Sequence, residues 1–512
     1  MSVGSEQRGP LSASIPAEAA LVSDARVIPR GPAGPALSRR RQGPVSSDVV
    51  CGCTQLADAA AVVLSGAIAV TAYLTGLLGK IVDYERYWLA IALAAVIFPF
   101  VHRRVGGYTI PRLSQLTWQI GRMVLTLAAT GSILTTLAFL AKVSPYYSRG
   151  WATLFLTLLF GTLGSVRMGV SLLIQHWTRA GKLSRVVAII GAGPLGQSVV
   201  AKLKAANDSR VRIQGVFDDR LTRVPTEISG THVLGTTDDL ISQVRQSLID
   251  EVILALPLRA EARIGELVAK LRSLPVDIRL SLDPVAGVFP MQRVTETASI
   301  QMIEILDRPL KHWSGVIKSL EDRVLSAALI ALTAPIMGVI ALAIRLDSRG
   351  PVFFVQDRFG FNNKAIPVIK FRTMSVEQAD CSGAARTKPG DPRVTRVGRI
   401  LRRLSLDELP QLFNVLMGDM ALVGPRPHVM AMLAGERLYH EAVGDYFQRH
   451  RVRPGITGWA QVHGLRGEID TPEKARARVA YDLWYIDHWS IWLDLRILLM
   501  TMRVILSGQN AY

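Results

Sequence analysis

Cysteine is scarce in this chain, which has only Cys51, Cys53 and Cys381 among its 512 residues. Three scattered thiols exclude a disulfide framework and do not form a four-ligand zinc site. No zinc finger and no aromatic RNA-binding signature accompanies the net charge of +18, so we expect no nucleic acid partner. The first 50 residues contain no apolar core before a cleavage site, and therefore do not look like a secretory signal peptide.

Long apolar runs are the feature that the chain does have. Hydrophobic residues make up 49% of it and the mean hydropathy is +0.27, which predicts that part of the protein lies in lipid. The four candidate membrane stretches cover residues 59–79, 87–101, 123–141 and 150–166. A span takes roughly 20 helical residues, so the short second stretch must borrow residues from its flanks.

Basic residues are distributed unevenly around these stretches. Six Arg precede the first stretch and further basic residues follow the second and the fourth, whereas each opposite loop has one Lys and one Arg. The positive-inside rule then places both ends of the bundle in the cytoplasm. We predict a bundle of four transmembrane helices over residues 56–178, after a disordered cytoplasmic tail over residues 1–55 that is rich in Pro, Ala, Ser and Gly.

A glycine-rich turn marks the middle of the chain. An apolar strand is followed by Gly191, Gly193 and Gly196 and then by a helical pattern, and Asp218 closes the next strand. This is the fingerprint of dinucleotide-binding units, and it predicts an α/β Rossmann-like domain over residues 183–309. Two roles stay open for that domain. It is either structural or regulatory, or it binds a nucleotide or dinucleotide.

The run SLDELPQLFNVLMGDMALVGPRPH contains two adjacent carboxylates, Asp407 and Glu408. In such a pair one carboxylate can attack a phosphorus atom while its neighbour holds Mg²⁺. Ser405 with Glu408 fits a capping box, and the alternative is that Asp407 caps the helix with Pro410 in its first turn. Both patterns predict a helix start, where two acids could also do no more than complement the helix dipole.

Basic residues that can bind phosphate oxygens surround this pair. They are Lys370 and Arg372 in VIKFRTM, Arg402 in GRILRRLSLDE, Arg426 in GPRP and Arg453 in VRPGITGWAQVHG. The whole set resembles the bacterial sugar transferase family, the polyprenyl-phosphate hexose-1-phosphate transferases, and most of all its undecaprenyl-phosphate glucose phosphotransferases. The resemblance covers residues 313–512 and also includes GPVFFVQDRFGFNNKAI and YDLWYIDHWSIWLDLRILLMT.

This resemblance implies an α/β monotopic phosphoglycosyl transferase domain over residues 313–512. It implies transfer of a hexose 1-phosphate from a UDP-sugar, with UDP-glucose favoured and galactose next, to undecaprenyl phosphate, with release of UMP. Asp407 would be the nucleophile that forms a phospho-aspartyl intermediate, and Glu408, with Asp407 beside it, would bind Mg²⁺. All five basic residues are carried over to phosphate binding, Arg402 and Arg426 ahead of the other three. The expected role is the first membrane step of exopolysaccharide or capsule synthesis.

A fifth apolar stretch, residues 324–344, is long enough to cross a membrane. It has basic flanks on both sides, and Pro335 within it removes one helix hydrogen bond and favours a kink. The resemblance implies a re-entrant hairpin over about residues 320–346, and a kinked spanning helix is the alternative. A re-entrant segment keeps Asp407 in the cytoplasm, where nucleotide sugars are found. We therefore expect a multi-pass protein of the bacterial inner membrane with a cytoplasmic catalytic domain.

Four aromatic residues near the end, Trp484, Tyr485, Trp489 and Trp492, are of the kind that favours the headgroup zone of a bilayer, and a place in the protein core is the alternative. The expected partners are thus a UDP-sugar, undecaprenyl phosphate and the lipid bilayer. The oligomeric state is open, with a homo-oligomer among the alternatives.

Two other functions are alternatives to the transferase. A membrane-anchored nucleotide-sugar dehydratase or epimerase would also carry a GxGxxG domain, but such enzymes generally need a Tyr-x-x-x-Lys pair, and none of the 11 tyrosines has Lys four residues later. A catalytically silent scaffold for polysaccharide assembly is the third hypothesis. A scaffold has no chemical need for two carboxylates among phosphate-binding side chains.

Overall fold

The computed structural model describes most of the chain after residue 45. The described residues are 46–73, 84–206, 208, 210–246, 249–281, 294–297, 300–375, 391–429, 433–434, 437–439, 443–465, 467 and 471–507. The predicted tail lies outside these residues except at its end. There the prediction of disorder is wrong, because α2 (Ser47–Val70) makes residues 47–55 helical. Asp48 complements the dipole of its first turn, and Val50 packs in a small apolar cluster with Ile110 and Leu113.

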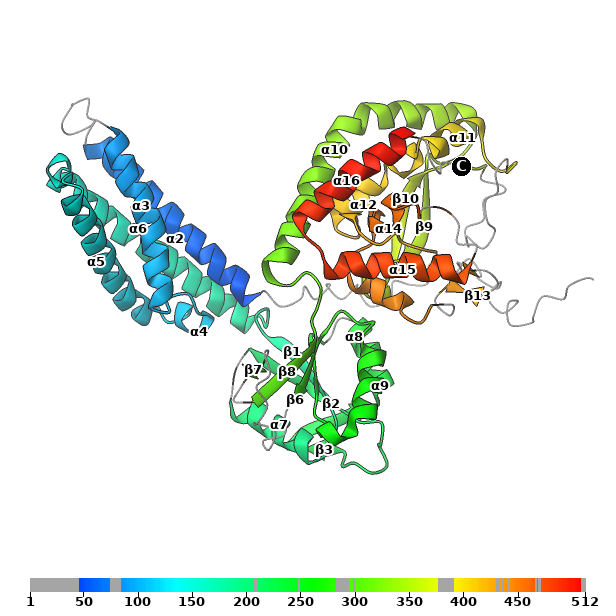
Figure 1. Ribbon diagram of the computed structural model, residues 1–512, viewed down its shortest axis with the longest axis horizontal. Coiled ribbons are helices and arrows are strands. Elements are labelled where there is room, and N and C mark those ends of the chain that lie inside the picture. The colour runs from blue at the N-terminus through cyan, green and yellow to red at the C-terminus, as the bar shows by residue number, and fades with distance from the viewer. Residues whose placement is uncertain are drawn as a thin grey trace, which may run out of the picture. The chain divides into compact units, whose positions relative to one another are not determined.

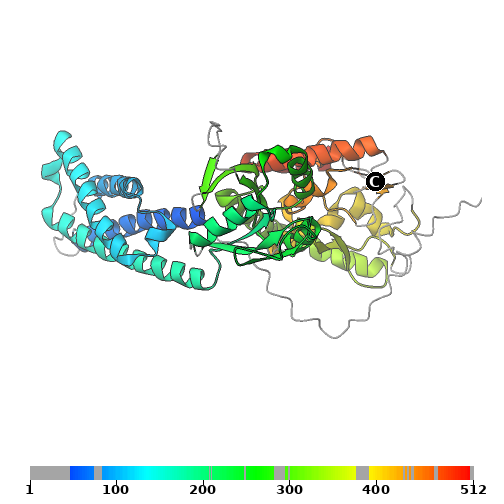
Figure 2. The ribbon, with the colours of Figure 1, turned by 90° about the horizontal axis from the view of Figure 1, so that it is seen from below.

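Four long apolar helices form the N-terminal bundle, and Figures 1 and 2 both show them side by side. They are α2, α3 (Tyr84–Arg104), α5 (Leu116–Leu140) and α6 (Arg149–Arg179), joined in part by the short α4 (Ile110–Leu113) and the 3₁₀ turn η2 (Ser144–Tyr146). Each is long and apolar enough to cross a membrane. The short second stretch does borrow residues from its flanks, because the apolar part of α3 extends over Glu85–Arg104, 20 residues.

The fifth apolar helix, α10 (His312–Asp347), has 36 residues and is helical throughout. Pro335 lies inside it, and Figure 1 shows the helix bent rather than straight. Its two halves are joined by helical backbone, not by a turn. The outward side chains are apolar, with Leu332, Val339 and Leu346 exposed by 73%, 70% and 79%, which suits contact with lipid.

An eight-stranded sheet is the centre of the middle domain, in the order β3-β4-β2-β1-β5-β6-β8-β7. The strands are β1 (Arg185–Ile190), β2 (Val211–Phe217), β3 (Glu227–Ile228), β4 (Thr231–Gly235), β5 (Glu251–Leu254), β6 (Asp277–Ser281), β7 (Val294–Thr297) and β8 (Ile300–Leu306). The five strands β4-β2-β1-β5-β6 run parallel, whereas β3, β8 and β7 join antiparallel. Because both faces of the parallel strands are buried, the sequence of β1 is a continuous apolar run.

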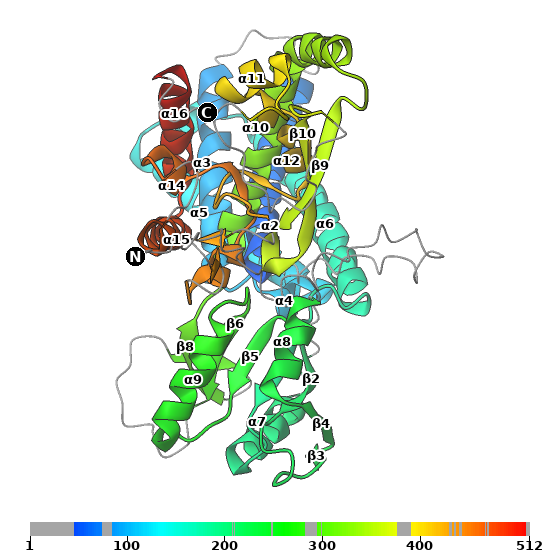
Figure 3. The same cartoon turned by 90° about the vertical axis from the view of Figure 1, so that its right-hand side faces the viewer.

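Helices cover both faces of this sheet (Figure 3). α8 (Thr237–Arg245) and α9 (Glu261–Leu271), which follows the turn η3 (Leu258–Ala260), pack on one face, and α7 (Pro194–Ala205) packs on the other. Local sequence explains the helix starts. Pro194 opens α7 at a position where no helix hydrogen bond is lost, and Thr236 with Asp239 forms a capping box before α8.

The C-terminal domain combines α10 with small sheets and short helices. Strands β9 (Phe353–Phe359) and β10 (Ala365–Phe371) form an antiparallel pair around the turn η5 (Phe361–Asn363), β11 (Ala421–Val423) pairs parallel with β14 (Gly455–Thr457), and β12 (Leu433–Ala434) pairs with β13 (Arg437–Leu438). The helical elements are α11 (Arg396–Arg403), η7 (Leu406–Glu408), α12 (Gln411–Met417), η8 (Tyr446–Arg451), α14 (Trp459–Val462), α15 (Pro472–Asp487) and α16 (Ile491–Ser507).

The core of this domain includes one of the four aromatics assigned to headgroups. Tyr485 is 3% exposed, and its hydroxyl donates to the Val423 carbonyl at 3.0 Å and to Asp494 at 2.8 Å. For Tyr485 the core alternative is therefore correct and the headgroup placement is not, because its polar tip finds partners inside the protein. Trp484 and Trp492, at 41% and 78%, are the exposed members of the group.

Candidate active site

The two acids lie on a tight turn that precedes a helix. Leu406–Glu408 form the 3₁₀ turn η7, and α12 begins at Gln411 with Pro410 as its N-cap. Neither predicted cap is present, because Ser405 makes no capping hydrogen bond and Asp407 lies before the helix. Ser405 has a φ of 56°, a left-handed conformation that costs energy in a residue with a Cβ atom. This strained residue turns the chain sharply between α11 and the two acids.

Glu408 is held between two cations. Lys370 Nζ lies 2.8 Å from Oε1, and Arg426 donates from Nη2 to Oε1 at 2.5 Å and from Nη1 to Oε2 at 3.2 Å. The bidentate contact with Arg426 orients the carboxylate and stabilises its ionised form. Burial opposes ionisation, but Arg426 and Lys370 outweigh it and keep the pKa of Glu408 well below its usual range. Glu408 is therefore ionised at neutral pH.

Asp407 is in a different state from its neighbour. Within the described part of the chain no hydrogen bond reaches its carboxylate. Burial raises the pKa of Asp407; the Lys370 charge opposes this rise and the charge of Glu408 adds to it. A carboxylate with a raised pKa and uncommitted oxygens is a better nucleophile than an ordinary aspartate.

Two arginines add positive charge near the acids. Arg402 on α11 donates from Nε to Thr373 Oγ1 at 2.9 Å, and the charge of Asp407 partly offsets the effect of burial on the Arg402 pKa, which is lowered. Sequence analysis missed Arg358 on β9, although QDRFG lies within the family resemblance. Burial first, and Arg426 second, lower the pKa of Arg358 to about 10. With Lys370 and Arg426, these arginines give four cations near two acids, a surplus that suits an anionic ligand.

The other two predicted phosphate ligands occupy different places. Arg372 donates to the Ser348 carbonyl at 2.8 Å and to Ser348 Oγ at 3.0 Å, so it satisfies groups at the C-terminal end of α10. Arg453 lies with one guanidinium nitrogen near Gly418, the C-cap of α12. The structure thus brings Lys370, Arg402 and Arg426 to the acidic pair and commits Arg372 to a helix end.

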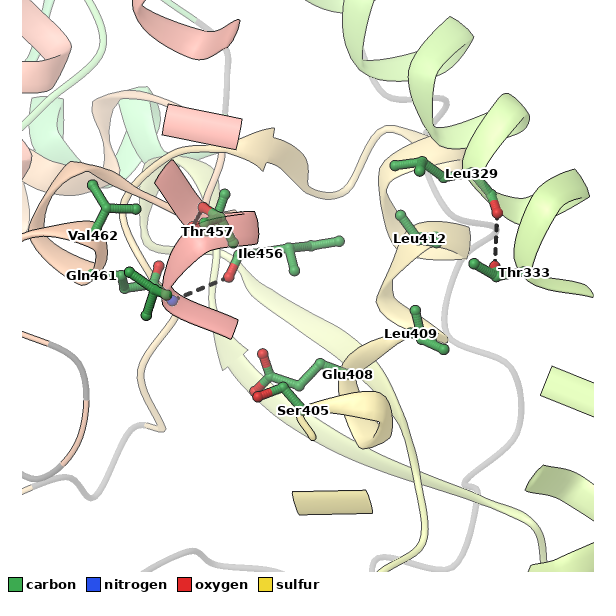
Figure 4. A pocket seen from close by; sticks show the side chains of 12 residues that line it. Leu329, Thr333, Ser405, Glu408, Leu409, Leu412, Ile456, Thr457, Gln461 and Val462 are labelled. Carbon is green, nitrogen blue, oxygen red and sulfur yellow. Dashed lines mark hydrogen bonds between the residues drawn. The ribbon is translucent and has the colours of Figure 1, made fainter. Parts of the chain in front are cut away.

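A pocket of about 170 Å³ opens beside Glu408. Figure 4 shows the Glu408 carboxylate and Ser405 between two apolar walls, with Leu409 and Leu412 on one side and Ile456 on the other. The remaining lining residues come from α10, β14, α14 and α16: Leu329, Thr333, Thr457, Gln461, Val462, Thr501 and Val504. The pocket therefore has a charged end and apolar walls, partly built by a helix of membrane-spanning length.

The donor chemistry of the pair fits Mg²⁺. The described residues contain no cluster of three or more His, Cys, Asp or Glu side chains. Mg²⁺, however, usually takes one or two carboxylates and completes its shell with waters and substrate phosphates. Asp407 offers free oxygens, and each oxygen of Glu408 keeps acceptor capacity beside its bonds to Arg426 and Lys370.

The acids at the end of β2 in the middle domain are already engaged. Asp218 accepts from the Ala192 amide at 2.9 Å and pairs with Arg220 at 2.9 Å. Burial opposes ionisation of Asp218, but Arg220 and the two backbone amides hold its pKa at about 2. Asp219 accepts from Thr237 and pairs with Arg263. The acid that would bind a dinucleotide ribose is thus occupied by the protein itself.

Comparison with known proteins agrees with the sequence resemblance. The bacterial sugar transferase family model matches residues 313–508, and a CoA-binding domain model matches residues 103–281. Undecaprenyl-phosphate glucose phosphotransferase of Komagataeibacter xylinus is 38% identical over 435 residues, which cover 83% of this chain and 78% of that protein. The UDP-glucose:undecaprenyl-phosphate glucose-1-phosphate transferase of Klebsiella pneumoniae is 38% identical over 344 residues, 66% of this chain and 72% of that protein.

A third relative differs in its sugar. The UDP-N-acetylgalactosamine-undecaprenyl-phosphate N-acetylgalactosaminephosphotransferase of Aeromonas hydrophila is 44% identical over 188 residues, 36% of this chain and 43% of that protein. The family assignment and the membrane helices are confirmed, whereas relatives named for two different sugars leave sugar choice open. This chain is a membrane protein that belongs to the bacterial sugar transferase family, among relatives that transfer sugar phosphates to undecaprenyl phosphate.

Proposed function

We propose that the protein transfers glucose 1-phosphate from UDP-glucose to undecaprenyl phosphate and releases UMP. The observation that carries this proposal is the unequal state of the two acids. Glu408 is held by two cations, whereas Asp407 keeps uncommitted oxygens near a surplus of positive charge. Membership in a transferase family speaks against the dehydratase or epimerase hypothesis.

In the first step an oxygen of Asp407 attacks the β-phosphorus of the UDP-sugar. A bond forms between that oxygen and phosphorus, the bond from phosphorus to the bridging oxygen of the diphosphate breaks, and UMP leaves with the electron pair. The phosphoryl group, still carrying the sugar, remains on Asp407. Lys370, Arg402 and Arg426 would balance charge on its oxygens, because phosphoryl transfer depends mainly on positioning and electrostatics.

In the second step a phosphate oxygen of undecaprenyl phosphate attacks the same phosphorus. The bond to Asp407 breaks, the carboxylate returns to its starting state, and the sugar leaves on a lipid diphosphate. The pocket supports this step, because a phosphate at the Glu408 end would place an isoprenoid tail between Leu412 and Ile456 and along α10. Apolar walls would also keep water from hydrolysing the intermediate.

Mg²⁺ would be held by Glu408 with Asp407 beside it. When bound, the ion would neutralise the diphosphate charge that otherwise repels the attacking carboxylate. Arg426 and Lys370 orient the Glu408 carboxylate for this purpose, since they fix it from two sides.

We also propose that α10 is re-entrant and that the catalytic domain, residues 313–512, lies on the cytoplasmic side of the bacterial inner membrane. Basic residues on both sides of the helix, Pro335 inside it and the bent course of α10 in Figure 1 support this topology. Residues 56–178 would be the transmembrane bundle. Residues 183–309 would be a Rossmann-like domain with a structural or regulatory role, as the occupied Asp218 suggests.

The reaction can be tested with membranes that contain the protein. UDP-glucose, UDP-galactose and UDP-N-acetylgalactosamine are supplied separately, each with undecaprenyl phosphate and Mg²⁺, and the nucleotide product is measured. We expect UMP, with UDP-glucose as the best donor. Release of UDP would show transfer of the sugar alone and would refute the mechanism, whereas UMP from another donor would correct only the sugar.

A further inference from the structure

Arg426 lies on a short backbone segment, residues 424–428, that is held almost entirely by other parts of the domain. Four successive carbonyls accept hydrogen bonds from outside the segment. The Pro425 carbonyl accepts from Gly455 N at 2.9 Å, Arg426 from Arg449 Nη2 at 2.9 Å, Pro427 from Arg358 Nη1 at 3.1 Å and His428 from Phe359 N at 3.1 Å. Two arginine side chains from different elements, Arg449 on η8 and Arg358 on β9, thus hold the backbone at and beside Arg426.

The segment needs these contacts because it has few backbone hydrogen bonds of its own to fix its conformation. Pro425 and Pro427 have no amide hydrogen, and the segment belongs to no helix or strand. Gly424 lies so close to β14 that a Cβ atom on it would come within 2.7 Å of the Arg453 carbonyl. The direction in which Arg426 leaves the backbone therefore depends on its neighbours.

Arg449 is the neighbour that holds Arg426 directly. Its side chain is fully buried on η8, and Nη2 pairs with Asp482 Oδ2 on α15 at 2.6 Å as well as with the Arg426 carbonyl. Its Nη1 contacts the ring of His428. Burial, followed by Arg449 and Arg478, keeps the pKa of His428 well below its usual range, so the imidazole is neutral and can accept from Arg449.

We propose that Arg449, anchored by Asp482, is a positioning residue that sets Arg426 on Glu408. The inference rests on the proposed role of Arg426 in the transferase reaction. Asp482 forms an ion pair with the Arg449 guanidinium, Arg449 donates to the Arg426 carbonyl, and the Arg426 side chain reaches both oxygens of Glu408. Neither Arg449 nor Asp482 needs to touch substrate for this role.

The matched control is Arg451, two residues further along the same 3₁₀ turn. It is also buried, at 7% exposed, and it also donates to a backbone carbonyl, that of Asp307 at 2.7 Å. That carbonyl lies before α10 and away from the Arg426 segment. Arg449→Lys and Arg451→Lys therefore make the same chemical change in the same element, and only the first removes the planar fork beside Arg426.

Purified full-length protein is assayed for UMP release, with kcat and KM for the UDP-sugar measured separately. We expect Arg449→Lys to lower kcat by about 100-fold, because a small misplacement of a charge-stabilising group has an effect of that order. The kcat of Arg451→Lys should stay within about threefold of the wild-type value, because this change does not affect the Arg426 segment. Asp482→Glu should retain more activity than Asp482→Ala, because it keeps an anion for Arg449.

Coupling to Arg426 distinguishes positioning from general damage. In an Arg426→Lys background, adding Arg449→Lys should lower kcat by less than about threefold, because both changes act through the same contact of Arg426 with Glu408. A full 100-fold loss in that background would overturn the proposal, and so would equal losses for Arg449→Lys and Arg451→Lys. If Arg449→Lys fails to fold, amide exchange of Gly455 and Phe359, whose N–H groups donate to the segment, is compared between Asp482→Asn and wild type. Faster exchange in Asp482→Asn supports the proposal, and unchanged exchange contradicts it. Wild-type protein that makes no UMP would instead refute the proposed function itself.

Discussion

Two regions of this molecule bury an acid against an arginine, with different outcomes. In the membrane bundle, Asp58 on α2 accepts from Arg167 on α6 at 2.5 Å and from the Tyr108 hydroxyl at 2.5 Å, and the two charged side chains are 0% and 1% exposed. In the C-terminal domain, Glu408 also contacts an arginine at 2.5 Å, but it has a second cation, a second acid and a pocket beside it.

The difference lies in charge balance and access. One acid and one cation in the bundle balance each other, and both are buried, so the pair links α2 to α6. Near Asp407 and Glu408 four cations outnumber two acids, and Glu408 itself lines a pocket. Isolated buried pairs are poor evidence of function, whereas an unbalanced cluster beside a cavity is a candidate functional site with a physical rationale.

The largest expected effect comes from removing the open carboxylate. Asp407→Asn keeps the size of the side chain but makes it a very poor nucleophile, so we expect UMP release to fall by at least about a thousandfold. The thermal unfolding midpoint should stay close to that of wild type, because no hydrogen bond from the described residues is lost. If Asp407→Asn kept a tenth of normal activity, another residue would have to be the nucleophile.

Glu408→Gln should be less severe. The amide cannot balance Arg426 and Lys370, and it is a weak ligand for Mg²⁺, so we expect a loss of about 100-fold and a higher Mg²⁺ concentration for half-maximal rate. Activity is measured over a Mg²⁺ titration, with wild type treated by a chelator and then resupplied as the reference. An unchanged metal dependence in the variant would assign the ion to other ligands.

Asp58→Asn tests the other half of the comparison. Leaving Arg167 buried without its acid should destabilise the protein by about 3 kcal/mol, measured by unfolding in detergent. The rate per folded molecule should change by less than about twofold. Asp58→Leu with Arg167→Leu should recover much of the stability, since no charge is left buried and unpaired. A large loss of rate in folded Asp58→Asn protein would show that the bundle pair takes part in catalysis.

Asp218→Asn is expected to have the smallest effect. The folded-state pKa of Asp218 is about 2, below its ordinary value, so its stabilisation is present at neutral pH and is lost as pH falls toward 2. The variant should have a lower thermal midpoint than wild type at pH 7, and the gap should narrow below about pH 4. A difference in thermal midpoint that is constant with pH would mean that packing, not charge, explains the lost stability. The activity of the variant at pH 7 should be nearly normal.

Sequence reasoning selected side chains that the structure brings together, because these residues lie in recognisable motifs. Asp407 and Glu408 are adjacent, and Lys370, Arg402 and Arg426 lie in short runs that the family resemblance aligned. The local structure of the pair was not predictable, because the left-handed Ser405 is set by packing between α11 and η7 and not by a cap. Arg372 looked equivalent to Lys370 two residues earlier, but β10 ends at Phe371, and Arg372, just beyond the strand, donates to the C-terminal end of α10.

The supporting residues could not be read from the sequence for a different reason. Arg449 and Asp482 are 33 positions apart in the sequence and meet only because η8 and α15 pack together. Apolar runs predicted the membrane helices, yet their ends differ from the prediction. α6, for example, continues to Arg179, because buried polar contacts such as Arg167 with Asp58 extend the packed helix beyond its apolar stretch.

The covalent intermediate is the most direct test of the central claim. Protein is mixed with UDP-glucose labelled with ³²P at the β-phosphate, without lipid acceptor, and then denatured and separated. We predict protein-bound label in wild type and none in Asp407→Asn. When undecaprenyl phosphate is added as a chase after labelling and before denaturation, the label should move from wild-type protein into lipid. Label bound equally to Asp407→Asn, or lipid product formed at the normal rate with no labelled protein at any time, would contradict the account.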